Sequence, residues 1–108
     1  DLAPAGQVFA QRPQRELGAI QAAIDLAGHI VAAGKLGLPE TVRENFSLLR
    51  NTGVISTELC RKMEAMVGFR NIAIHNYQAL DPEILKAILR ERLPDLEDFS
   101  AAILRIER

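Results

Sequence analysis

The stretch RELGAIQAAIDLAGHIVAAG, Arg15–Gly34, decides the fold of this chain. Its larger apolar residues recur at steps of three and four, at Leu17, Ile20, Ile24, Ala27 and Val31. Because an α-helix turns by about 100° per residue, this spacing places all five side chains on one face. The pattern therefore predicts an amphipathic helix that packs on a core and ends at Gly34 and Gly37.

The segment LPETVRENFSLLRNTG predicts a second, shorter helix, with Pro39 in its first turn and Gly53 as its stop. Glu40 lies beside the positive end of that helix. Ser56 or Thr57 can cap a third helix, which runs through ELCRKMEAMVGFRNIAIH. Helical periodicity thus continues without a linker or a repeat.

A fourth helix is predicted from LDPEILKAILRERL, with Asp81 as its N-cap and Pro82 at its first position. Pro94 removes one backbone hydrogen bond and either kinks this helix or restarts it. The apolar pattern then continues through Leu96, Phe99, Ile103 and Ile106. The fold prediction is an all-α, up-and-down helical bundle of four to five helices.

Composition narrows the class of protein. A chain of 108 residues with 48% hydrophobic and 25% charged residues is typical of one folded domain, and neither of a disordered tail nor of a membrane protein. The net charge of -1 excludes a protein whose whole surface attracts polyanions, so any attraction for RNA must be local. Cys60 has no partner cysteine and is expected to be a small buried hydrophobe. With no signal peptide, a cytoplasmic protein is expected.

The run FRNIAIHNY gathers four polar side chains at the end of the third helix: Arg70, Asn71, His75 and Tyr77. Relative to Arg70, Asn71 lies near 100°, His75 near 140° and Tyr77 near 340° on an ideal helix turning by about 100° per residue. Arg70 and His75 therefore cooperate only if the last turn of the helix bends or ends.

Structural explanations compete with a functional one for each of these residues. A histidine is favoured at a helix C-terminus, so His75 needs no chemical role. Arg70 can pair with a carboxylate, and Tyr77 can anchor the turn through a buried hydroxyl. Together, these explanations support the hypothesis of a helical structural dimer without nucleic-acid chemistry.

The same run, with Arg, four residues, His, one residue and Tyr, resembles the signature of the HEPN superfamily and of its HepT-like toxins. These toxins are the ribonuclease partners of MNT nucleotidyltransferase antitoxins. The segments AIDLAGHIVA, FSLLRNTGVIS, MVGFRN and LDPEIL resemble this family in the same order. The resemblance implies one HEPN domain over residues 1–108 that lacks part of its N-terminal helix, with residues 1–14 expected as a loop remnant.

The resemblance implies a metal-independent endoribonuclease without a cofactor, which cleaves tRNA or mRNA as a homodimer whose Arg-x4-His-x-Tyr motifs face each other across a cleft. Arg70 and His75 are then catalytic, and Asn71 and Tyr77 support them or contact phosphate. Tyr77 is also the implied acceptor of AMP from the antitoxin, which blocks the RNA site. No metal site is expected, because the two histidines lack zinc-site spacing.

Asp25 and His29 lie four residues apart on the first helix, off its apolar stripe. We expect a hydrogen bond on the helix surface or a contact at the dimer interface. The resemblance offers a second reading, in which both residues line the RNA cleft. A HEPN-type module that binds nucleotide or RNA without cleaving it is the alternative to the ribonuclease as a whole.

Overall fold

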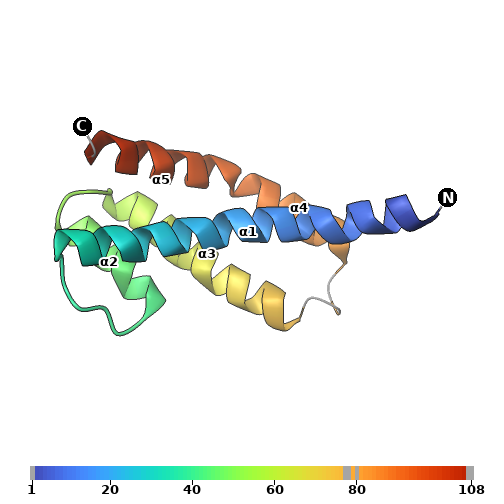
Figure 1. Ribbon diagram of the computed structural model, residues 1–108, viewed down its shortest axis with the longest axis horizontal. Helices are drawn as coiled ribbons and strands as arrows, with labels where there is room; N and C mark the ends of the chain where they lie inside the picture. Colours follow the sequence, from blue (N-terminus) through green and yellow to red (C-terminus); the bar gives the residue numbers. More distant parts are fainter. Residues whose placement is uncertain (1, 77–78, 80, 107–108) are drawn as a thin grey trace.

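The computed structural model describes the backbone of residues 2–76, 79 and 81–106, and the side chains within these ranges from Arg15 onward. This part of the chain forms five α-helices: α1 (Leu2–Gly34), α2 (Val42–Asn51), α3 (Thr57–His75), α4 (Pro82–Glu91) and α5 (Leu93–Ile106). In Figure 1, α1 runs along the long axis, α3 returns, and α4 and α5 run back in the direction of α1. The predicted all-α bundle is confirmed.

The core forms around α1, which packs against each of the other four helices. The stripe predicted from its sequence is buried at all five positions, from Leu17 to Val31. Phe46 of α2 and Phe99 of α5 meet edge to face, with ring centroids 5.6 Å apart and ring planes at 68°. Aliphatic and sulfur-containing side chains fill the remaining space, among them Leu49, Met63 and Met66.

Helix caps explain where α3 and α4 begin. The Ser56 hydroxyl accepts the backbone N–H of Leu59 at 3.0 Å, so Ser56 rather than Thr57 caps α3. Asp81 accepts the N–H of Glu83 at 2.9 Å, and Pro82 opens α4 as predicted. These caps satisfy backbone donors that have no partner inside the helix.

The start of α2 differs from the prediction. Pro39 and Glu40 lie before the helix, and Thr41 is its N-cap, accepting the N–H of Glu44 at 3.3 Å. The Glu44 carboxylate accepts the N–H of Glu40 at 2.9 Å, which closes a capping arrangement in both directions. Two side-chain caps therefore outweigh the preference of proline for a first turn. Gly53, with φ 82°, ends the helix region as predicted.

The expectation of a loop over residues 1–14 is wrong for the backbone that the structure describes, because α1 begins at Leu2. Pro4 lies in the first turn, where the missing N–H has no intrahelical partner to lose. Pro13 removes one hydrogen bond, but helix-favouring residues on both sides continue the helix through it.

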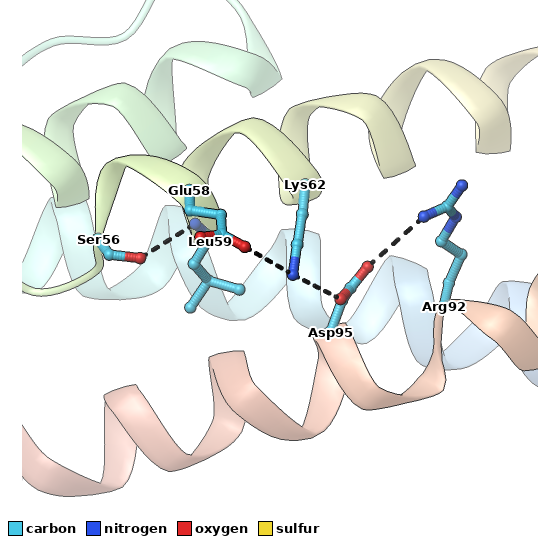
Figure 2. A network of polar contacts seen from close by, with 6 residues as sticks. All are labelled: Ser56, Glu58, Leu59, Lys62, Arg92 and Asp95. Carbon is cyan, nitrogen blue, oxygen red and sulfur yellow. Dashed lines mark hydrogen bonds and ion pairs between the residues drawn. The ribbon is translucent and has the colours of Figure 1, made fainter.

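A new helix, α5, begins at Leu93, and Pro94 is its second residue, so the helix restarts at the proline rather than bending through it. Arg92 separates α4 from α5 with helical backbone angles, so the two helices form one bent arm. Asp95 in the first turn of α5 is 7% exposed, and its carboxylate lies 3.8 Å from Lys62 Nζ and 3.9 Å from an Arg92 nitrogen. Figure 2 shows this network, which ties α5 to α3.

Lys62 is shared between two carboxylates. Its Nζ lies 3.2 Å from Glu58 one turn earlier, and the hydrogen bond with Glu58 raises the pKa of Lys62 above its usual value, with Asp95 adding a smaller effect. The ammonium group therefore stays charged and bridges an exposed carboxylate and a buried one.

By length and composition alone, Arg15–Gly34 is apolar enough to cross a membrane. In the structure this segment is the central helix of the bundle, and its apolar stripe packs against the other helices. Asp25 and His29 are exposed on its opposite side. The same hydropathy is typical of a core helix in a bundle.

Candidate active site

The last turn of α3 presents the predicted polar residues at the end of the helix. His75 is the final helical residue and is exposed. Asn76 follows as the C-cap: its backbone N–H and its side-chain amide both donate to the carbonyl of Ile72, at 3.0 and 3.1 Å. This cap ends α3 directly after His75, before the chain passes on to α4 (Figure 1).

Arg70 is half-buried, and its guanidinium is turned toward its neighbour Asn71. Arg70 Nη1 donates to Asn71 Oδ1 at 3.0 Å. The Nε group is buried and has no hydrogen-bond partner in the described part of the chain. No carboxylate among the described residues lies within ion-pair distance of Arg70. A buried donor without a partner is costly, so a structural ion pair within the described residues does not explain the position of this guanidinium.

Asn71 connects Arg70 to the side of the helix on which His75 lies. On an ideal helix Arg70 and His75 are about 140° apart, and Asn71 lies between them. The hydrogen bond to Asn71 draws the guanidinium toward that intermediate position. Between described atoms, no hydrogen bond joins His75 to Arg70 or Asn71. The structure therefore brings Arg70 and Asn71 into contact and leaves His75 nearby but separate.

Asn71 and His75 form a polar strip along the last turns of α3, and two isoleucines flank it. Ile74 and Ile72 are 47% and 59% exposed, and on an ideal helix they lie on either side of Asn71 and His75, about 60° from the nearer polar residue. Ala73, which is fully buried, marks the opposite side of the helix that faces the core. Large apolar side chains that are exposed close together are a feature of surfaces that contact other molecules.

Tyr77, the last residue of the sequence motif, lies outside the residues that the structure describes. The two candidate residues on α1 are placed clearly. Asp25 accepts a hydrogen bond from Gln21 at 2.8 Å on the helix surface, rather than from His29. His29 is exposed one residue after Gly28, which lies against the side-chain amide of Asn45 in α2.

A second arginine, which the sequence motif does not include, lies on the same side of α3. The guanidinium of Arg43 from α2 occupies the space that a side chain at Gly68 would fill. Gly68 precedes Asn71 by three residues and His75 by seven, so the three share one broad helix face. A glycine inside a helix is the only sequence signal for this contact, because glycine there often marks a close approach.

Cys60 is placed as a structural residue. It is 1% exposed, and its burial raises the pKa of the thiol, which the Glu64 carboxylate raises further. Within the described ranges, no three His, Cys, Asp or Glu side chains gather closely enough to hold a metal ion.

Comparison with known proteins points to one family. Residues 17–103 match the ribonuclease HepT-like family. The chain is 39% identical over 79 residues to the mRNA nuclease HepT of Shewanella oneidensis, covering 73% of this chain and 59% of that protein. It is 36% identical over 62 residues to the tRNA nuclease HepT of Aphanizomenon flos-aquae, covering 57% of this chain and 42% of that protein. The chain thus spans less than two thirds of either relative.

Solved structures agree with these matches. A toxin–antitoxin structure with AMP-PNP superposes with a TM-score of 0.76 at 32% identity, over 90% of this chain and 74% of the other. The tri-AMPylated HEPN toxin of Shewanella oneidensis, in complex with its MNT antitoxin, gives a TM-score of 0.72 at 34% identity, over 97% of this chain and 76% of the other.

Proposed function

Because the chain belongs to the ribonuclease HepT-like family, we propose that it cleaves RNA as the toxin of a toxin–antitoxin pair. The observation that carries this proposal is the state of Arg70, whose guanidinium is turned to Asn71 and has no carboxylate partner among the described residues. A cation held in this way next to an exposed histidine fits a phosphodiester better than it fits a structural ion pair.

The proposed reaction needs no metal, because RNA carries its own nucleophile beside each phosphate. His75 accepts the proton of the 2′-OH as that oxygen attacks phosphorus, and returns it to the 5′ oxygen when the P–O5′ bond breaks. One product then ends in a 2′,3′-cyclic phosphate and the other in a 5′-OH. Arg70 holds the non-bridging oxygens while charge builds on them, and Asn71 orients the guanidinium.

We further propose that two copies of the chain form the site, with the strips around His75 facing each other across a cleft. The isoleucines that flank the strip support this arrangement, because Ile72 and Ile74 expose apolar surface next to polar groups. A second copy also supplies a second Arg70 and His75, which compensates for the angle between them on one helix.

Inhibition by a nucleotidyltransferase antitoxin completes the proposal. The solved relative from Shewanella oneidensis is AMPylated and bound to an MNT antitoxin. For this chain we propose that the antitoxin transfers AMP from ATP to the hydroxyl of Tyr77, two residues after His75 in the sequence, with release of pyrophosphate. The added phosphates then occupy the place of RNA beside Arg70. Such a pair acts in the cytoplasm, where ATP and RNA are both present.

Expression toxicity tests this function. We expect growth arrest on expression of the native chain, rescue by a co-expressed MNT-type nucleotidyltransferase, and no arrest with Arg70→Ala. Arg105→Ala is the matched control, because Arg105 is an exposed arginine at the far end of α5. Equal arrest by the native chain and Arg70→Ala, at equal protein levels, contradicts the proposal and favours a HEPN-type module without catalysis.

A further inference from the structure

The contact between Arg43 and Gly68 extends the polar strip of α3 away from His75. We infer that Arg43 binds a backbone phosphate of the RNA that neighbours the cleaved one. This inference rests on the proposed function, since it assigns a second subsite to the same RNA strand. It concerns a residue of α2 that lies outside the Arg-x4-His-x-Tyr motif.

The absence of a side chain at Gly68 leaves room for Arg43 on the surface of α3. A Cβ atom at Gly68 would lie 2.5 Å from Arg43 Nη2 and 3.6 Å from Cζ, so the guanidinium lies directly on the helix surface. From Gly68 to His75 the chain advances seven residues, about 10.5 Å along the axis, and turns back to within about 20° of the same direction. Arg43, which contacts Gly68, therefore lies on the same broad face of α3 as Asn71 and His75.

The charges on this face of α3 favour one direction for an RNA strand that contacts Arg43. No carboxylate in the described part of the chain lies within ion-pair distance of Arg43, so its charge is available to an anion. One turn before Gly68, the Glu64 carboxylate accepts a hydrogen bond from Ser47 at 3.2 Å. A phosphate is repelled there. An RNA backbone bound at Arg43 is thus directed toward Asn71 and His75.

Two substitutions test the inference in different ways. Arg43→Gln removes the charge. Gly68→Ala keeps the charge but places a methyl group where the guanidinium lies, and the folded state survives because the displaced atom is the end of a flexible side chain and alanine favours helix. Arg105→Gln is the control for loss of one positive charge, because Arg105 is exposed in the last turn of α5, and this end of α5 lies away from the C-terminal end of α3 (Figure 1).

The experiment measures cleavage of a short single-stranded RNA, together with binding of its 2′-O-methyl counterpart, which cannot be cut, over a range of salt concentrations. We expect Arg43→Gln and Gly68→Ala each to raise KM and Kd about tenfold, the range of one charge-assisted contact, with kcat within about twofold. The double variant should be no worse than Arg43→Gln. For Arg43→Gln, the slope of log Kd against log salt concentration should fall by about 0.7, the value for one phosphate of a single strand.

Thermal unfolding of each variant separates this role from a purely structural one. The inference is overturned, while the nuclease stands, if KM and Kd of Arg43→Gln equal those of Arg105→Gln. The same holds if KM, Kd and kcat of Arg43→Gln change only in step with loss of folded protein. If neither the native chain nor any variant cleaves RNA, but binding still depends on Arg43, the nuclease is overturned, while the phosphate contact of Arg43 stands as part of an RNA-binding site without cleavage. A native chain that neither cuts nor binds RNA overturns both.

Discussion

Cys60 shows how burial controls the chemistry of a single residue. Its thiol is enclosed in the core and lies near the Glu64 carboxylate, and both effects raise its pKa above the ordinary value of 9.0. A reactive cysteine needs the opposite surroundings, with exposure and nearby positive charge. Cys60 is therefore a packing residue, as its place in a helical apolar pattern predicted.

We predict that Cys60 makes the folded state less stable in alkali. The unfolded thiol loses its proton first, so stability that is fully present below pH 9.0 decreases as the pH rises through the higher folded value. Urea unfolding from pH 7 to pH 10 should show this decrease, and Cys60→Ala should show a smaller one. Rapid alkylation of Cys60 in the folded protein at neutral pH would contradict this assignment.

The arginines of the site show what a motif predicts at this scale. Spacing in the sequence placed Arg70, Asn71 and His75 on one broad face of α3, but it did not predict the hydrogen bond that turns the Arg70 guanidinium toward Asn71. Arg43 itself gave no signal, and Gly68 was the one hint of its contact, because that contact depends on α2 lying across α3 at Gly68. Contacts between helices depend on tertiary packing, which the pattern of one helix does not contain.

At the scale of elements, Asp95 holds α5 against α3. Its carboxylate is almost fully buried and lies near Lys62 and Arg92, both of which reach solvent (Figure 2). Removing the carboxylate frees both cations to turn outward, so the cost is the loss of two moderate contacts rather than a stranded buried charge.

We predict that Asp95→Ala lowers the free energy of unfolding by about 1 kcal/mol, the upper value for ion pairs whose partners reach solvent. The measurement is urea unfolding followed by circular dichroism. Glu97→Ala, two residues further on and exposed, is the control and should change stability by less than about 0.5 kcal/mol. Equal stability of both variants would show that the network of Figure 2 does not hold α5.

Helix ends were predictable where one side chain decides them. Asp81 with Pro82, and Ser56, cap their helices by hydrogen bonds to backbone groups two or three residues away, which a linear sequence displays. The start of α2 was predicted wrongly because Thr41 and Glu44 act together. The long N-terminal extension of α1 was missed because Pro13 reads as a break in the sequence, whereas the helix continues through it.

The whole molecule leaves apolar surface uncovered at the end of α3. We predict that the chain is a dimer and that Ile72→Asp makes it monomeric, because a carboxylate at that position must lose its hydration in an interface. Analytical ultracentrifugation measures this. Leu104→Asp on α5, at 60% exposure against 59% for Ile72, is the matched control and should remain a dimer.

A monomeric native chain, or a dimer that only Leu104→Asp separates, would contradict the arrangement in which the two strips of α3 face each other. In the second case the dimer would form through α5, and the polar strip of α3 would be exposed to solvent in each copy. Periodicity predicted the bundle, whereas the outer face that meets a second copy was expected only from the family resemblance, because the pattern of one chain does not contain contacts between two.

The central claim is that Arg70 and His75, at the end of one helix, cleave RNA by attack of its own 2′-OH. The most direct measurement is the chemical nature of the new ends when the purified chain cuts a defined RNA in the presence of EDTA. The account predicts 2′,3′-cyclic phosphate and 5′-OH ends, with the rate reduced about 10²–10⁴-fold in His75→Ala. Ends of another kind, activity that EDTA abolishes, or equal rates for the native chain and His75→Ala would contradict it.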